Sequence, residues 1–336
     1  MHHQILAAAC PPDLCIYHAG CTDGSISAAI VLEQFPNCKA MAFTYHKDLR
    51  PEDVQGKKVI IVDFSFKGQN LYVLRRHSAA WFILDHHASA LPLKDEPNVV
   101  IDMTRSGAQI TWDTFHPGEP APPVVQHVQD YDLWHHKLED TMAVIAGLSV
   151  HPIHKPQRLI DFLSGGFPAL LEEGRIVYRA AEERRNRIRA MIRRINIAGF
   201  EDVPVVNCPR DALVTDKLGE EQALTSPFFV TWYQEAGGRC KYSIRSNKAN
   251  ADWMDVSFLA LCYGGGGHEN SAGFVDIASP GNLPYLASPD GPVSVRELWE
   301  RIGGHELSRA DRLTRLREEM ASWLQRPVGS STIGDP

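Results

Sequence analysis

Three consecutive residues whose side chains can bind a metal follow a strongly apolar segment of this 336-residue chain. The segment is residues 80–84, and the triplet after it is Asp85-His86-His87. A short apolar run bounded by polar residues is typical of a buried parallel strand. In an open α/β sheet, ligands bind beyond the carboxyl ends of the strands, which is where this triplet would lie. The carboxylate and the two imidazoles therefore indicate a metal site.

The same arrangement recurs elsewhere along the first 130 residues. Two further apolar segments, residues 14–17 and 59–62, run directly into His18 and Asp63. A third apolar stretch, containing three valines, precedes Asp130. We expect the segments to deliver the following side chains to one edge of one sheet: His18, Asp23, Asp63, His86 and Asp130. Imidazole nitrogens with several carboxylate oxygens suit manganese or a similar divalent cation better than structural zinc, which prefers thiolates.

Two motifs in this order resemble a known family. The Asp-His-His triplet is the signature of the DHH phosphoesterase superfamily. The run GGGGHENSAGF at residues 264–274 resembles the glycine-rich signature of the DHH-associated domain that accompanies it in one large branch. The resemblance covers residues 14–277 and leaves the C-terminal part unexplained.

The resemblance implies roles for individual residues. Asp63 would bridge two cations, Asp23, His86 and Asp130 would complete the first cation site, and His18 would help to hold the second. His87 would face the substrate phosphate, and Asp85 is a candidate for fixing the tautomer of one imidazole. The expected cofactor is two Mn²⁺ ions, with Mg²⁺ or Co²⁺ as substitutes.

The segment that begins at His18 corresponds to the first motif of the family, and it departs from the family pattern. In that pattern, a histidine is followed by two carboxylates spaced two residues apart. Here Asp23 is present, but the position two residues before it is Cys21. Cys21 as a thiolate, the neighbouring Thr22, or water would replace the missing carboxylate. Asp132 is also close enough in sequence to compete with Asp130. We favour Asp130, because it directly ends the apolar stretch.

The glycine cluster and a nearby strand are expected to bind substrate. Glycines let backbone N–H groups approach a ligand closely, and His268 adds a directional donor. A tight turn between secondary elements is the alternative interpretation. By resemblance, Arg245 on the strand at residues 242–246 would grip a phosphate, whereas on sequence alone a surface salt bridge is almost equally favoured. The expected substrate-binding residues are Arg245, Gly265, Gly266, Gly267 and His268, and the expected catalytic residues are Asp85 and His87.

Composition favours an enzyme acting on a small substrate. With 44% hydrophobic and 22% charged residues, the chain can bury two ordinary cores. The net charge of −7 does not fit a protein that tracks long nucleic acid, so a short nucleotide is the expected partner. The seven cysteines form no CxxC pair, and no apolar stretch is long enough to span a bilayer. We therefore expect a cytoplasmic protein without membrane partners. The sequence does not decide between a monomer and a homodimer.

The alternation of strands and helices predicts an α/β protein with two domains. The first would be a mostly parallel, doubly wound sheet, and the second a smaller α/β substrate-binding domain, joined to it by a helical linker. The expected limits are 1–160 for the catalytic domain, 161–197 for the linker, 198–280 for the substrate-binding domain and 281–336 for a helical extension and tail. Eight arginines lie in the expected helix at 172–195, either on a solvated face or as a positive wall for phosphate-bearing substrates.

The resemblance thus implies a phosphodiesterase that hydrolyses short oligoribonucleotides, or linear or cyclic dinucleotides, to nucleoside 5′-monophosphates with metal-activated water. One alternative within the same fold is a phosphomonoesterase acting on 3′,5′-bisphosphate nucleotides, or a polyphosphate hydrolase. An alternative of another class is a non-catalytic nucleotide or metal sensor, because the first motif lacks one carboxylate.

Overall fold

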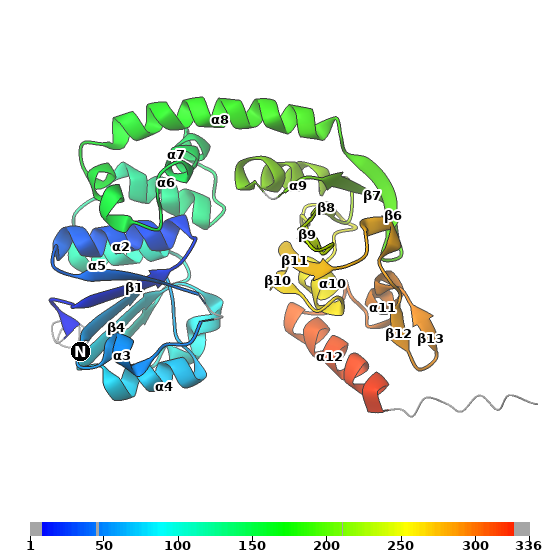
Figure 1. Ribbon diagram of the computed structural model, residues 1–336, viewed down its shortest axis with the longest axis horizontal. Helices are drawn as coiled ribbons and strands as arrows, with labels where there is room; N and C mark the ends of the chain where they lie inside the picture. The colour runs from blue at the N-terminus through cyan, green and yellow to red at the C-terminus, as the bar shows by residue number, and fades with distance from the viewer. Residues whose placement is uncertain (1–8, 45–46, 210, 326–336) are drawn as a thin grey trace, which may run out of the picture. The chain divides into compact units, whose positions relative to one another are not determined.

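The computed structural model describes residues 9–44, 47–209 and 211–325. The chain forms two compact units, Met1–Ala180 and Ala181–Pro336, and the division between them falls inside one long helix, α8 (Phe167–Arg189) (Figure 1). The structure therefore divides the chain once, and the four-part division stays a prediction. The first eight residues lie outside the described part of the chain.

The first unit is built on a five-stranded sheet in which every strand is parallel to its neighbours. The order is β2-β1-β3-β4-β5. The strands are β1 (Leu14–His18), β2 (Lys39–Phe43), β3 (Lys58–Val62), β4 (Ala80–Asp85) and β5 (Val99–Ile101). Strands β1, β3 and β4 match the apolar runs at residues 14–17, 59–62 and 80–84. The predicted parallel α/β fold is confirmed.

Helices cover both faces of this sheet, because alternate strand residues are apolar on each side. On one face, Tyr17, Val62 and Leu84 pack with apolar residues of α2 (Thr22–Gln34) and α5 (Gly107–Phe115). On the other face, Ile16, Ile61 and Ile83 belong to the core that includes residues of α3 (Pro51–Val54) and α4 (Gly68–His77). The remaining elements of this part of the chain are η1 (Ala88–Leu93), α6 (Pro123–Asp132), α7 (Thr141–Ser149) and η2 (Pro156–Leu163).

The strand order reverses between β1 and β3. The chain runs from β1 outward to β2, and then returns to the other side of β1 to form β3, β4 and β5. At such a topological switch point, the loops after the two strands diverge and leave a crevice at their carboxyl ends. The residues that end β1 and follow β3 are His18 and Asp63, so the fold itself puts these two side chains at the crevice.

The second unit contains a six-stranded mixed sheet of order β10-β11-β9-β8-β7-β6. Its strands are β6 (Arg193–Ile197), β7 (Phe200–Asn207), β8 (Phe229–Gln234), β9 (Cys240–Arg245), β10 (Gly266–His268) and β11 (Ser271–Asp276). The other elements are η3 (Ala212–Asp216), α9 (Lys217–Gln222), α10 (Val256–Cys262), η4 (Pro280–Asn282), β12 (Leu286–Ser288), β13 (Gly291–Val293), α11 (Val295–Arg301) and α12 (Arg309–Gln325). The core joins Tyr242 and Ile244 of the sheet to Phe258 of α10 and Trp299 of α11. The C-terminal extension is thus part of this unit's core.

Two expectations about helices need correction. The arginine-rich helix ends at Arg189, and residues 193–197 form strand β6 instead of continuing it. The valine-rich stretch before Asp130 is not a strand but helix α6. Three arginines of α8 form ion pairs with carboxylates, which favours the solvated face over a positive wall; the pairs are Arg175–Asp140, Arg184–Asp211 and Arg189–Glu221. Among the described helices, none has the length and apolarity that crossing a bilayer requires.

Candidate metal centre

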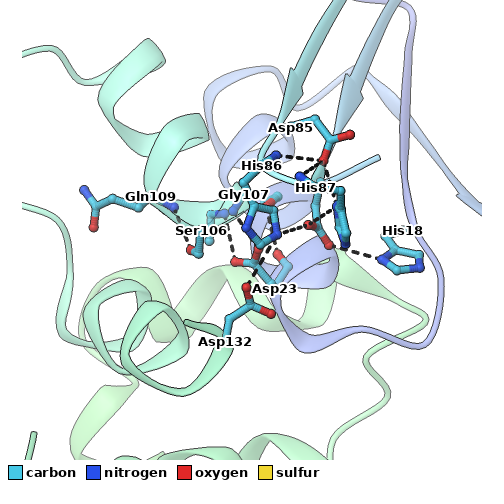
Figure 2. A network of polar contacts seen from close by, with 12 residues as sticks. His18, Asp23, Asp85, His86, His87, Ser106, Gly107, Gln109 and Asp132 are labelled. Atoms are coloured by element: carbon cyan, nitrogen blue, oxygen red, sulfur yellow. Dashed lines mark hydrogen bonds and ion pairs between the residues drawn. The ribbon is translucent and has the colours of Figure 1, made fainter. Parts of the chain in front are cut away.

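Side chains from β1, β3 and β4 meet at the carboxyl edge of the parallel sheet. His86 Nε2 lies 3.1 Å from Asp63 Oδ1, and His18 Nδ1 lies 3.5 Å from Asp63 Oδ2. Asp23, from the first turn of α2, places Oδ2 3.7 Å from His86 Nε2. Figure 2 shows His86, Asp23 and Asp132 directed toward one another beside this edge. The structure therefore brings together four of the five expected metal ligands, His18, Asp23, Asp63 and His86.

Asp63 is held in an unusual conformation. Its backbone φ is +53°, in the left-handed region that Asp adopts more readily than most residues, and its side chain is fully buried. Two glycines allow this packing. A Cβ on Gly107 would lie 2.6 Å from Asp63 Cβ, and a Cβ on Gly24 would lie 3.0 Å from Asp63 Oδ2. The close approach of these two helix starts leaves room only for glycine.

Asp23 is fixed by the N-terminus of α5. Its two carboxylate oxygens accept hydrogen bonds from the backbone N–H groups of Gly107, at 2.6 Å, and Ala108, at 2.9 Å. The N-terminus of a helix favours an anion, because its N–H groups have no partners within the helix. Ser106 caps this helix and also donates its backbone N–H to Gln129 of α6. The position of Asp23 is thus set by three helices.

Asp132, and not Asp130, reaches the other ligands. Asp132 Oδ2 lies 3.4 Å from His86 Nε2. Asp130 instead accepts hydrogen bonds from the backbone N–H groups of Lys137 and Leu138 and from the hydroxyl of Thr141. The two aspartates are two residues apart in helix α6. Because a helix turns by about 100° per residue, their side chains point to nearly opposite sides of it. Our preference for Asp130 assumed a strand end, and the helix reverses it.

Asp85 orients His87. Asp85 is fully buried and its Oδ1 lies 2.8 Å from His87 Nδ1, while Ser65 donates to its Oδ2 at 2.5 Å. The backbone N–H groups of His86 and His87 also bond to Asp85 Oδ1. A carboxylate that holds one ring nitrogen fixes both the orientation and the tautomer of the imidazole. Asp85 therefore acts as a positioning group, and the other nitrogen of His87, Nε2, is left to act as a donor or acceptor.

Burial and neighbouring charges shift the pKa values of the clustered carboxylates and of His86. Burial, and then the charges of Asp63 and Asp132, raise the pKa of Asp23 well above its usual value. Burial also raises the pKa of Asp132. Burial alone would raise the pKa of Asp63, but its contacts with His18 and His86 hold that pKa well below the usual value. Burial would lower the pKa of His86, but the nearby carboxylates raise it to about 9. Carboxylates packed this closely cannot all ionise unless positive charge is supplied.

The donor atoms fit divalent cations. Three groups of side chains place one ligand atom each within 4.8 Å of the others, and these groups are His18/Cys21/Asp63, Asp63/His86/His87 and Asp23/His86/Asp132. Asp63 belongs to two of them, which suits a carboxylate that bridges two ions. Asp63 Oδ2 is buried and accepts no hydrogen bond from any described residue. A buried oxygen of this kind has a high desolvation cost, which a cation would offset.

Cys21 belongs to the same cluster as His18 and Asp63. It is the N-cap residue of α2, and its side chain forms no capping hydrogen bond. Burial, and then the charges of Asp63 and Asp23, raise the pKa of its thiol well above the usual value. The structure thus brings the thiol of Cys21, one of the substitutes considered for the missing carboxylate, to the cluster.

The expected substrate-binding residues lie in the second unit. Gly266, Gly267 and His268 form β10, and the side chain of His268 lies outside the part of the chain that the structure describes. Gly265 lines a cavity of about 540 Å³ together with Tyr233, Lys241 and Ser243, among others.

Arg245, which we expected to grip a phosphate, is engaged in a buried salt bridge. Its Nη2 lies 2.7 Å from Asp216 Oδ1, and the residue is only 7% exposed. Tyr263, the aromatic residue next to the glycine run, stacks on Phe274 and donates its hydroxyl to the backbone of Pro284. The structure therefore favours the salt-bridge interpretation of Arg245.

Several residues that shape the metal centre were missed in the sequence. Gly24 and Gly107 have no side chain, and Ser65 contributes through its hydrogen bond to Asp85, which the sequence does not reveal. Gly24 follows Asp23 directly, and Ser106-Gly107 opens a predicted helix, so a small residue at a helix start beside a candidate ligand was the available signal.

Comparisons with known proteins found a relative by sequence and solved structures with partial likeness in fold. No protein-family model matches it. An uncharacterised protein, R106, of Acanthamoeba polyphaga mimivirus is 28% identical over 303 residues, which cover 81% of this chain and 69% of that protein.

Three solved structures show partial likeness in fold. A pGpG-specific phosphodiesterase from Vibrio cholerae aligns with 91% of this chain and 99% of its own, at 12% identity and a TM-score of 0.48. An exopolyphosphatase-related protein from Bacteroides fragilis covers 82% of this chain and 91% of its own, at 10% identity and a TM-score of 0.46. RecJ from Thermus thermophilus in complex with Mn²⁺ covers 81% of this chain and 51% of its own, at 15% identity and a TM-score of 0.48. The chain is thus similar to an uncharacterised viral protein in sequence and, below a TM-score of 0.5, to these three structures in fold.

Proposed function

We propose that the protein is a DHH-type phosphoesterase that depends on divalent cations, and that it hydrolyses short oligoribonucleotides or linear or cyclic dinucleotides to nucleoside 5′-monophosphates. The observation that carries the proposal is the cluster of Asp23, Asp63 and Asp132 around His86 at the topological switch point. The order of the two sequence motifs supports the same assignment.

Each residue has a distinct task in this proposal. Asp63 is shared between the cations, Asp23, His86 and Asp132 complete one site, and His18 with Cys21 contributes to the other. When bound, the cations would neutralise the phosphate oxygens and lower the pKa of a water molecule. We propose Mn²⁺ as the ion of the carboxylate-rich site, because hard oxygen donors with one imidazole suit it.

His87 supplies the polar contact of the protein itself to the phosphate. Asp85 holds its Nδ1, so a protonated ring would present Nε2–H as a donor. Burial would lower the pKa of His87, but the hydrogen bond to Asp85 and the charge of Asp63 raise it. The ring therefore keeps its proton more readily than an ordinary histidine and can donate to an anionic substrate oxygen.

A panel of substrates tests the proposal. Di- to pentaribonucleotides, cyclic dinucleotides, a 3′,5′-bisphosphate nucleotide and polyphosphate would each be incubated with Mn²⁺ or Mg²⁺, and the products separated by chromatography. We expect nucleoside 5′-monophosphates from dinucleotides and none from Asp63→Asn. Turnover of the bisphosphate nucleotide or polyphosphate without cleavage of dinucleotides would replace the proposal by the corresponding alternative. Nucleotide binding without any turnover would favour a sensor.

A further inference from the structure

One of the two candidate cation sites contains sulfur. The ligand atoms of His18, Cys21 and Asp63 lie within 4.8 Å of one another, whereas the group formed by Asp23, His86 and Asp132 offers two carboxylates and one imidazole. The two groups are therefore chemically unequal, although they lie side by side at one sheet edge.

A second observation marks the sulfur-containing group as a place for a ligand. Asp63 Oδ2, which approaches His18 Nδ1 to 3.5 Å, is fully buried and accepts no hydrogen bond from the described residues. Its other oxygen, Oδ1, contacts His86 Nε2. Oδ1 of Asp63 thus contacts His86, whereas the buried Oδ2 has His18 Nδ1 at 3.5 Å and accepts no hydrogen bond from the described residues.

The local backbone suits a thiolate at position 21. Cys21 is the N-cap of α2, a helix of 13 residues, and its side chain forms no capping hydrogen bond. The N-terminal N–H groups of a helix favour negative charge, so they stabilise sulfur in its ionised form once a cation has displaced the proton. The helix N-terminus would stabilise the negative charge of a thiolate at this position in the same way as that of the carboxylate in the family pattern.

We infer that the His18–Cys21–Asp63 group is a thiolate-containing cation site that selects Zn²⁺ or Co²⁺ over Mn²⁺, so that the centre holds two different metals. This inference rests on the proposed function for its two-cation arrangement. Thiolate and imidazole ligands favour zinc and cobalt, while the carboxylate-rich neighbour keeps its preference for harder ions. On binding, the Cys21 S–H bond breaks, a metal–sulfur bond forms, and the proton passes to solvent.

The direct test is an absorption titration of the cation-free protein with Co²⁺, in the absence of any substrate. A cobalt–thiolate bond produces a charge-transfer band in the near ultraviolet. We expect this band in the wild type, with release of about one proton for each cobalt ion bound to sulfur. Cys21→Asp and Cys21→Ser should abolish it. Cys208→Ser, which removes another partly exposed cysteine in the second unit, should leave it unchanged.

Competition between metals gives a second readout that is independent of activity. Equilibrium dialysis against Zn²⁺ with an increasing excess of Mn²⁺, followed by metal analysis, gives the ratio of the two affinities. Because zinc binds most nitrogen and oxygen sites more tightly than manganese does, the sign of the thiolate is a larger zinc-to-manganese affinity ratio in the wild type than in Cys21→Asp. If wild-type protein binds cobalt stoichiometrically without the near-ultraviolet band, or if Cys21→Asp keeps the wild-type affinity ratio, the inference is wrong.

The inference and the proposed function fail in different experiments. The cobalt band and the metal ratio are measured without nucleotide, so they do not depend on which phosphate ester is hydrolysed. Absence of turnover on the whole substrate panel would remove the proposed function and leave the thiolate site standing. Absence of the band, with dinucleotide hydrolysis present, would leave the proposed function and remove the thiolate site.

Discussion

The two units of this protein bury charge in opposite ways. In the second unit, two buried arginines are paired with carboxylates: Arg245 with Asp216, and Arg312 with Glu269 at 2.6 Å and Asp255 at 3.4 Å. In the first unit, Asp23 and Asp63 are as deeply buried, but each faces other carboxylates, and histidines are their cationic neighbours. A buried charge is tolerated when it is paired or coordinates a metal. The contrast indicates that the arginine network is a structural feature, and that the aspartate cluster is complete only with cations.

The arginine network also explains why the C-terminal extension is part of its unit. The guanidinium carbon of Arg312, in α12, lies 5.4 Å from the ring centroid of Trp253 and 5.4 Å from that of Trp299. It donates to Glu269, which lies in the turn between β10 and β11, within the glycine-rich signature. Arg309, from the same helix, donates to the backbone carbonyl of Gly267. The extension therefore holds the glycine-rich hairpin in place.

Removing the shared carboxylate should have the largest effect. Asp63→Asn keeps the shape of the side chain, and asparagine tolerates the positive φ, so backbone strain is not introduced. We expect cation-dependent turnover to fall by about 10³-fold or more, because several kcal/mol of transition-state stabilisation is lost. Initial-rate measurements would show this. Asp95→Asn, the same change at an exposed site of the same unit, should leave the rate unchanged.

Breaking the paired network should cost stability instead. Arg312→Met removes the nearest cation from the buried Asp255, which keeps Arg309 at 3.8 Å, and leaves Glu269 with Lys248 alone. We expect the free energy of unfolding to fall by about 3 kcal/mol. Denaturant unfolding followed by circular dichroism would measure the loss. Arg317→Met, at an exposed position of the same helix, is the matched control. A loss below about 1 kcal/mol would contradict the proposed difference between the two units.

The pH dependence of stability should differ between the cation-free and cation-bound protein. The pKa of His86 is raised to about 9 in the folded state, from an ordinary value of 6.5. Its protonation therefore stabilises the cation-free fold below pH 6.5, and this contribution is lost as the pH rises from 6.5 through 9. We expect a loss of order 3 kcal/mol over that window. This loss of unfolding free energy between pH 6.5 and 9, measured by denaturant unfolding, should be absent in His86→Gln and unchanged in the control His135→Gln. Saturating Mn²⁺ should also remove it from the wild type.

The smallest effect should come from Gly107, which has no side chain that could bind a cation. A Cβ at Gly107 would lie 2.9 Å from Asp23 Oδ2 and would displace both buried carboxylates. Gly107→Ala should therefore lower the affinity for Mn²⁺ by about 10–100-fold, as is typical of changes behind the ligands. Isothermal titration calorimetry would measure it. Gly165→Ala, where nothing lies within 4 Å of the added carbon, should bind Mn²⁺ as the wild type does.

The strands and the ligands at their ends could be predicted because each depends on a short local pattern. A run of apolar residues that stops at His18, Asp63 or Asp85 shows both the buried strand and its carboxyl end. The choice between Asp130 and Asp132 failed because the valines before them have helical spacing, and the direction of a side chain in a helix changes by about 100° per residue. The packing of Gly24 and Gly107 against Asp63 joins segments far apart in sequence, so no local pattern could reveal it.

The central claim is that the buried carboxylates of the first unit are completed by divalent cations. The free energy of unfolding, measured as a function of free Mn²⁺ at pH 7.5, tests it most directly. We predict that the wild type gains about 2.7 kcal/mol when free Mn²⁺ reaches a hundred times its dissociation constant, and that Asp63→Asn gains far less. A wild-type stability that does not change from zero to millimolar Mn²⁺ would contradict the account.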